Sequence, residues 1–224
     1  MIGPEPAPLD LGTAYGESRD RLSALIAAAS NPSGVAVPAC PGWSVHDVVS
    51  HLVAVAEDVL AGRLTAPPDD STTAEQVARR RDRPTGEVLE EWAAVSPGME
   101  ELLRGVTIWP AVMDALSHEH DVRAALGVPG GRDLPVISTV AARMLSWYKP
   151  PVGLTVRVGG QTFEYRPDSD DPGLALDTDA FEVFRFRLGR RSRRQLAAMA
   201  WTGDPSAVLD SLTVFGPSPL DIVE

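Results

Sequence analysis

One amphipathic segment, residues 45–63, sets the strongest constraint on how this chain can fold. Ser44 stands just before it as a cap for the free amides of a helix, and Asp47 three residues later completes a capping-box pattern. At about 100° per residue, the apolar side chains that follow fall on one side of the helix, with His51 at the margin of that stripe. Such a stripe must be buried against other helices, so the segment predicts a helical bundle. The stripe consists of Val45, Val48, Val49, Leu52, Val53, Ala56, Val59 and Leu60.

Four other segments carry helical signals that complete this bundle. Their apolar residues recur at helical spacing, and turn or capping residues bound them. Residues 65–84 differ, because they are rich in Pro, Asp, Thr and Arg. We expect them to form a solvated connection or a short exposed helix, and we assign them no chemistry. The four expected helices span residues 11–30, 85–103, 109–126 and 135–148.

The sequence pattern changes near residue 150. Residues 154–158 and 161–165 are rich in β-branched and aromatic side chains, which favour strands. The pair Gly159-Gly160 between them is typical of a two-residue turn, so the two segments predict a β-hairpin. A domain boundary is therefore expected close to residue 150.

The C-terminal part mixes short segments of both kinds. Residues 179–188 fit either a helix or a strand, while Asp204-Pro205 predicts the cap and first turn of a helix that reaches Leu212. The expected fold class is therefore α+β. An antiparallel helical bundle over residues 1–149 is followed by a small α+β domain over residues 150–224.

Composition limits the partners of such a protein. Its 224 residues carry 31 acidic against 20 basic side chains, a formal net charge of −11 that repels nucleic acid and anionic membrane surfaces. Cys40 is the only cysteine, and the first residues show no export signal. No stretch approaches the roughly 20 apolar residues of a membrane span. We expect a cytoplasmic monomer or homodimer that acts on a small molecule, without nucleic-acid or membrane partners.

A histidine and a carboxylate on one expected helix indicate a metal site. Asp114 and His118 are four residues apart, which places them on one helix face within reach of one ion, and His51 from another helix can complete the set. Two imidazoles and one carboxylate suit a divalent cation such as Zn²⁺ and leave coordination positions open. The structural alternative for the Asp114 and His118 pair is a simple hydrogen bond. His46 and His120 point away from the expected core, so we expect both to be solvated.

Two further residues have both a structural and a chemical interpretation. Glu119 falls on the apolar stripe of its helix, so it either pairs with an arginine or acts as a general acid of raised pKa. Cys40 is either packed beside Pro41 or acts as a nucleophilic thiolate.

Four arginines gather in the C-terminal part of an otherwise acidic chain. They form either a solvated face or an anion clamp, because guanidinium groups match carboxylates bidentately and a small acid substrate needs its charge neutralised. The four are Arg190, Arg191, Arg193 and Arg194.

Several of these motifs together resemble one family. The stretch from Val37 to Leu52, VPACPGWSVHDVVSHL, resembles the second-helix signature of the mycothiol-dependent maleylpyruvate isomerase family, within the DinB-like metalloenzyme superfamily. Residues 114–127, which contain HEHDVRAALG, resemble the second metal-binding helix of that family. The sequences LGRR at 188–191 and WTGDP at 201–205 resemble its C-terminal signatures. The likeness thus spans nearly the whole chain.

The resemblance implies a DinB-like four-helix bundle that binds a divalent metal, usually zinc, and a thiol cofactor, mycothiol. Its metal ligands map to His51, Asp114 and His118, although the isomerase that names the family has glutamate where this chain has Asp114. The family also implies an arginine at the mouth of the active site, and Arg190 occupies the matching position.

The resemblance further implies the type of reaction. A metal-activated thiol would act as the nucleophile in an isomerisation or an S-transfer on a small, anionic electrophile. Two other readings remain open: a thiol-independent metal enzyme with hydrolytic or ring-forming chemistry, and a non-catalytic DinB-like binding protein.

Overall fold

The computed structural model describes residues 3–64, 66–166 and 173–224, and its contacts divide the chain into two units. We call residues 10–129 the helical unit, and residues 130–223 together with residues 3–9 the sheet unit. Among the described residues, no helix is both long and apolar enough to cross a membrane.

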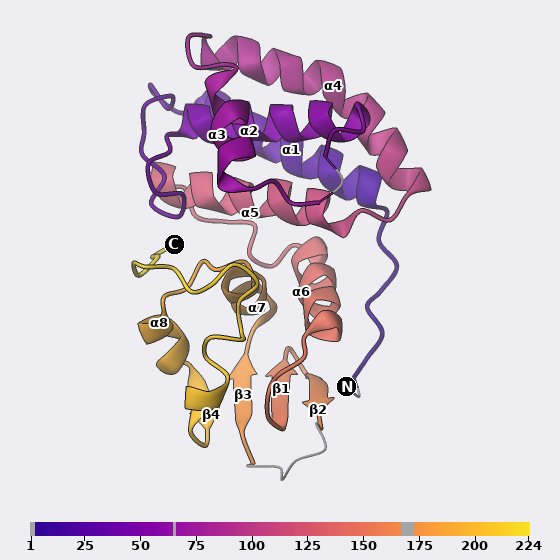
Figure 1. The fold of residues 1–224 in the computed structure, drawn as a ribbon, viewed down its shortest axis with the longest axis vertical. Helices are drawn as coiled ribbons and strands as arrows, with labels where there is room; N and C mark the ends of the chain where they lie inside the picture. Colours follow the sequence, from indigo (N-terminus) through magenta and orange to yellow (C-terminus); the bar gives the residue numbers. More distant parts are fainter. Residues whose placement is uncertain (1–2, 65, 167–172) are drawn as a thin grey trace. The chain divides into compact units, whose positions relative to one another are not determined.

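The helical unit contains five helices (Figure 1). Helix α1 packs against α4 and α5, and α2 packs against α3, α4 and α5. The expected bundle is therefore confirmed, and within it α2 contacts both α4 and α5. The helices are α1 (Leu11–Ala28), α2 (Val45–Leu60), α3 (Asp70–Ala78), α4 (Thr85–Gly105) and α5 (Trp109–Leu126).

Local capping fixes where the two central helices begin and end. The Ser44 hydroxyl accepts from the amide of Asp47, whose carboxylate accepts in turn from the Ser44 amide, so α2 starts with the expected capping box. Helix α5 ends at Gly127, whose φ of 65° lies in the left-handed region that glycine adopts without strain. The start of α2 and the end of α5 are therefore fixed by local contacts.

Residues 66–84 are more ordered than a solvated connection. Asp69 caps the nine-residue helix α3, and its carboxylate accepts from the amide of Thr72. Gln76, a residue of this helix, is fully buried, and Arg80, just after the helix, is 5% exposed. A short helix was one of the two forms expected for this segment, and one of its residues, Gln76, contacts His51, as described below.

The sheet unit contains a four-stranded sheet of order β2-β1-β3-β4 (Figure 1). The expected hairpin is confirmed, with Val156 opposite Phe163, while β3 runs parallel to β1 and antiparallel to β4. The strands are β1 (Leu154–Val158), β2 (Gln161–Tyr165), β3 (Ala175–Thr178) and β4 (Ala200–Thr202), and the helices are α6 (Pro135–Trp147), α7 (Ala180–Arg187) and α8 (Arg193–Ala197).

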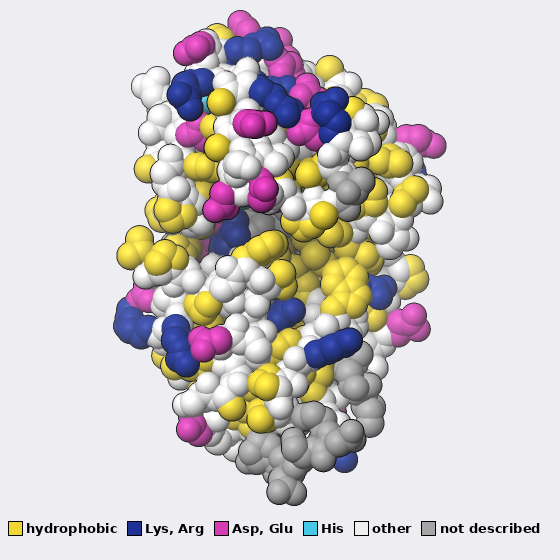
Figure 2. Space-filling model, viewed as in Figure 1, with side chains coloured by type: hydrophobic (Ala, Val, Ile, Leu, Met, Phe, Trp, Pro, Cys, Tyr) yellow, Lys and Arg dark blue, Asp and Glu magenta, His cyan; other side chains and the backbone are white. Residues whose placement is uncertain are grey.

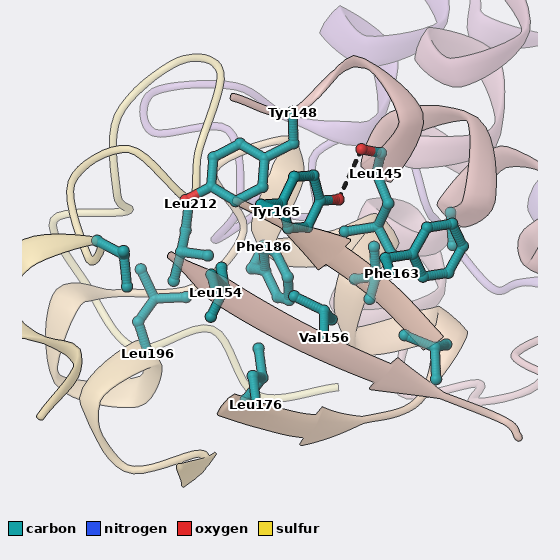
Figure 3. Close-up of a cluster of buried hydrophobic side chains, with 14 of the residues drawn as sticks. Leu145, Tyr148, Leu154, Val156, Phe163, Tyr165, Leu176, Phe186, Leu196 and Leu212 are labelled. Atoms are coloured by element: carbon teal, nitrogen blue, oxygen red, sulfur yellow. Dashed lines mark hydrogen bonds between the residues drawn. The ribbon is translucent and has the colours of Figure 1, made fainter. Parts of the chain in front are cut away.

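The sheet and its helices share one apolar core (Figure 3). Side chains of α6, the sheet and α7 meet in it, and the hydroxyl of Tyr165 donates to the carbonyl of Leu145 at 2.7 Å. Arg187 lies against this core, where its Nη1 donates to the carbonyl of Leu212 at 2.7 Å and its guanidinium stacks on Tyr148. The buried guanidinium of Arg187 is thus accommodated by carbonyl and aromatic partners.

The structure decides between the expectations for two segments of the C-terminal part. Residues 179–188 form the helix α7, because Asp179 caps it by accepting from the amide of Glu182. The helix expected to run from Asp204 to Leu212 was wrong. Only a single 3-10 turn, Pro205–Ala207, forms, and the chain beyond it turns so that Leu209 and Leu212 enter the core.

The observed units differ from the expected domains in where they place α6. We expected the boundary at 149/150, whereas the contacts divide the chain between Pro129 and Gly130. Helix α6 packs against α7 and contributes Ala141 and Leu145 to the core of the sheet unit. Its apolar face is buried in the sheet core, although it directly follows the helices of the bundle in the sequence.

Candidate metal centre

Three side chains of the helical unit converge between α2 and α5. Nε2 of His51 on α2 lies 3.5 Å from Oδ2 of Asp114, and Nε2 of His118, one turn further along α5, lies 3.4 Å from Oδ1 of the same carboxylate. The ligand atoms of all three residues lie within 4.8 Å of one another. The two histidines are buried, and the side chain of Asp114 is 31% exposed. The expected triad is therefore brought together in space.

The opposite nitrogen of each ring also has a defined contact. Nδ1 of His51 lies 3.0 Å from Oε1 of Gln76, and Nδ1 of His118 lies 3.0 Å from Oδ2 of Asp121. Metal-binding histidines usually hold their second nitrogen in this way, which fixes the ring orientation. The indole of Trp43 covers both rings, with centroid distances of 5.2 Å to His51 and 6.1 Å to His118.

The charges of these groups reinforce one another. Burial opposes ionisation of Asp114, but the charges of His51 and His118 and the hydrogen bonds with them outweigh it and hold the pKa of this carboxyl well below its usual range. Burial likewise opposes protonation of His118, yet Cys40, Asp114 and Asp121 raise the pKa of its imidazole well above the ordinary value. A cluster with such a demand for positive charge suits a divalent cation.

A second group of potential ligands shares His118. Sγ of Cys40 lies 3.7 Å from Nδ1 of His118 and donates to Oδ2 of Asp121 at 3.5 Å. These three side chains could also surround a metal ion. The two groups use opposite nitrogens of one ring, so a zinc ion bound through Nε2 of His118 leaves Cys40 as a neighbour of the ligand.

Glu119 is placed away from this chemistry. It is fully buried and accepts from Ser18 at 3.1 Å, from Arg21 at 2.9 Å and from Arg123 at 3.0 Å. Both oxygens of its carboxylate are thus held by guanidinium groups. The arrangement matches the arginine pairing that we set beside the general-acid role, so we no longer assign Glu119 a catalytic role.

The other two histidines are not solvated, so that expectation was wrong. His46 is half-buried, with Nδ1 at 2.9 Å from Oγ1 of Thr85 and Nε2 at 2.9 Å from the carbonyl of Arg80. His120 is only 3% exposed. The expectation failed for His120 because α5 is buried on more than one side, and for His46 because Thr85 and the carbonyl of Arg80 lie against its ring.

Arg190 belongs to the sheet unit. Its Nη1 donates to the carbonyl of Leu188 at 2.8 Å, and the neighbouring Arg191 forms an ion pair with Glu182 at 2.6 Å. Part of the arginine run is therefore occupied by structural partners. A role for Arg190 toward an anionic substrate stays a prediction.

Sequence reasoning missed Gln76 and Asp121. Asp121 stands three residues after His118, a spacing that places both on one helix face, so the pattern carried a usable signal. Gln76 had none, because its contact with His51 joins a polar segment to a different helix. These two residues complete the surroundings of the candidate ligands.

Two imidazoles and a carboxylate inside a helical bundle define a bundle protein with a candidate divalent-metal centre. Residues 15–128 match the family model of the mycothiol maleylpyruvate isomerase N-terminal domain, and the chain belongs to this family. The resemblance noted in the sequence is thereby confirmed.

Comparison with known structures extends the likeness to both units. Two crystal structures of the mycothiol-dependent maleylpyruvate isomerase, one of them a histidine-to-alanine variant, align with 82% of this chain and 90% of theirs. Their TM-scores are 0.55 for the variant and 0.53 for the other structure, each at 14% identity. At this identity the likeness shows a common fold. No curated protein matches the sequence significantly.

Proposed function

We propose that this protein is a metal-dependent enzyme that uses mycothiol as a nucleophile, either to isomerise a small electrophilic substrate or to join mycothiol to it through sulfur (S-transfer). The observation that carries the proposal is the convergence of the Nε2 atoms of His51 and His118 on the carboxylate of Asp114. The family membership supports mycothiol as the thiol.

The donor set fits a divalent metal, and zinc is the proposed ion. His51 and His118 would hold it through Nε2, and Asp114 would supply the anionic oxygen, so that three protein ligands leave positions open for the thiol or substrate. Bound there, such an ion acidifies a coordinated thiol and provides a nucleophile near neutral pH, which accounts for thiol chemistry without a catalytic cysteine. Trp43 covers the two histidines and limits the access of water to their rings.

The proposed substrate is a small anion with an electrophilic carbon. An activated alkene would undergo cis–trans isomerisation, and an epoxide or a carbon with a leaving group would undergo S-transfer. Arg190 is our candidate for holding the anionic group, by its match to the family motif. The thiol-independent metal enzyme is the second candidate, because the same three ligands would serve water-based chemistry equally well.

Metal analysis combined with thiol binding tests the proposal. The wild type should bind about one equivalent of zinc, and His51→Ala, Asp114→Ala and His118→Ala should each lose most of it. His46→Ala is the matched control, since His46 lies on the same helix as His51 but contacts Thr85 and Arg80 instead. Zinc binding unchanged in all three ligand variants contradicts the metal site.

Calorimetry with mycothiol then separates the candidate functions. Saturable binding to the zinc-loaded wild type that disappears in His118→Ala supports the thiol enzyme, and turnover of maleylpyruvate to its trans isomer would identify the isomerase. Zinc binding without any mycothiol binding favours the thiol-independent alternative.

A further inference from the structure

His51 can serve as a ligand only if its Nε2 atom offers a lone pair. Its proton must then reside on Nδ1, and Nδ1 lies 3.0 Å from Oε1 of Gln76. The Gln76 amide alone does not determine which nitrogen of His51 carries the proton, because an amide has an acceptor oxygen and a donor NH₂ group, and either could face the ring. The next contact of Gln76 therefore sets the proton position on His51.

That next contact is a carboxylate. Nε2 of Gln76 donates to Oδ2 of Asp58 at 2.9 Å, and both side chains are buried. An ionised carboxylate can only accept hydrogen bonds. The NH₂ group of Gln76 must therefore face Asp58, which leaves the carbonyl oxygen of Gln76 to face His51.

Two arginines keep Asp58 ionised from its other side. Its Oδ1 accepts from Arg63 at 2.7 Å and from Arg79 at 2.9 Å. Burial opposes ionisation of Asp58, but the hydrogen bonds from Arg79, Gln76 and Arg63 outweigh it and lower its pKa to about 2. Both arginines reach the surface, with side chains 58% and 38% exposed.

We propose that Asp58 and Gln76 are positioning residues that hold the proton of His51 on Nδ1 and thereby present Nε2 to the metal. The proposal rests on the proposed metal site. It assigns to α3 the task of delivering one buried amide to α2 in this relay.

Basic and acidic side chains alternate over the helical unit on the face shown in Figure 2. Ion pairs of this unit include Arg80 with Glu57 at 2.6 Å and Arg83 with Glu87 at 3.2 Å. These ion pairs connect the residues that follow α3 to α2 and to α4. Gln76 is thereby kept opposite His51.

The substitution Asp58→Asn tests the relay without touching a ligand. Arg63 and Arg79 only donate, so the oxygen of the new amide stays with them and its NH₂ group faces Gln76. The Gln76 amide must then reverse and present its NH₂ group to Nδ1, which moves the His51 proton to Nε2. We expect zinc affinity, measured by chelator competition, to fall by about 10- to 100-fold.

A second change should rescue the first. In Asp58→Asn/Gln76→Glu, the new carboxylate accepts both from the amide at position 58 and from Nδ1 of His51, so the proton returns to Nδ1. The double variant should recover most of the lost affinity and the visible spectrum of the cobalt-substituted wild type. Arg63→Gln is the control, because it removes one ion pair of Asp58 while keeping the carboxylate opposite Gln76, and it should bind zinc like the wild type.

Three results would overturn the proposal: wild-type affinity in Asp58→Asn, a folded double variant no better than Asp58→Asn, or an equal loss in Arg63→Gln. Nitrogen-15 NMR of labelled histidine gives a readout that needs no metal. In the metal-free Asp114→Ala background, which removes the carboxylate that competes for the proton at Nε2, Nδ1 of His51 should be protonated when Asp58 is present and unprotonated in Asp58→Asn; an unprotonated Nδ1 with Asp58 present refutes the relay. A wild type that binds no zinc refutes the proposed function, while the NMR result still decides the relay.

Discussion

Oδ2 of Asp121 lies 3.0 Å from Nδ1 of His118, one helical turn back on α5. Asp121 is fully buried, so the contact forms a carboxylate–histidine pair shielded from water. Such pairs fix the orientation and raise the basicity of a metal-binding imidazole. His118 is thus held by a carboxylate, whereas His51 is held by an amide.

This contact leads to the first prediction. Replacing Asp121 by asparagine removes the charge behind His118 but keeps the shape, so zinc affinity should fall by about tenfold or more. Chelator competition measures the change, and circular dichroism verifies the fold. Unchanged affinity would show that the pair serves only packing.

Cys40→Ala is the partner experiment and distinguishes the two groups of potential ligands. Zinc bound by His51, Asp114 and His118 should remain in this variant, because Cys40 is only a neighbour of His118. Loss of the metal in Cys40→Ala, with retention in His51→Ala, would instead place the ion among Cys40, His118 and Asp121.

The site illustrates which contacts a sequence can disclose. Asp114 and His118 share one helix, so their spacing alone predicts that they meet, and the capping box at Ser44 fixes the register of His51. Gln76 reaches His51 from a segment of polar composition, and no local pattern encodes that approach. Contacts between separate segments depend on how helices pack, which the sequence shows only indirectly.

Glu119 provides a prediction about stability. Glu119→Ala leaves two guanidinium groups without their buried carboxylate, so the free energy of unfolding should fall by about 3–5 kcal/mol. The zinc content of the folded fraction should stay at the wild-type level, which urea titration and metal analysis together would test.

Glu17→Ala is the matched control for that change. Glu17 contacts the same Arg21 at 3.8 Å, but its side chain is 62% exposed. Removing it should cost less than about 1 kcal/mol, as for other surface ion pairs. Loss of zinc from folded Glu119→Ala would restore a role for Glu119 at the site.

Asp58 makes stability depend on pH in acid. Its pKa is lowered from 3.8 to about 2 in the folded protein, so its contribution is complete above about pH 4 and is lost as the pH falls through about 2. The difference in unfolding free energy between the wild type and Asp58→Asn should therefore shrink by roughly 2 kcal/mol between pH 5 and pH 2. A difference independent of pH would contradict the ionised pairing with Arg63 and Arg79.

The packing of α1 against α4 yields a further prediction. A Cβ atom added at Gly12 would lie 2.3 Å from the carbonyl oxygen of Glu100, a backbone atom that cannot move alone. Gly12→Ala should therefore destabilise the protein by about 1–3 kcal/mol, although alanine favours helices. Gly86→Ala meets no atom within 4 Å and should leave the melting temperature unchanged or higher. Equal effects of the two changes would show that α1 and α4 separate easily.

Some parts of the fold could likewise be predicted from the sequence, and others could not. Helix starts and the Gly159-Gly160 hairpin depend on neighbouring residues and were predicted correctly, whereas two helices end earlier than expected, at Ala28 and at Leu60. The parallel pairing of β1 with β3 and the grouping of α6 with the sheet depend on contacts between distant segments. The segment after Ala207 also lies in this second group, because Leu209 and Leu212 are buried in the core of the sheet unit, a contact between distant segments.

Helix α3 has only nine residues, yet one of them sets the second contact of His51. One residue inserted between Asp69, which caps this helix, and Gln76 would rotate the amide by about 100° around the helix axis and carry it away from its histidine. We therefore expect changes within α3 to alter zinc affinity at the proposed site, with all three candidate ligands left intact.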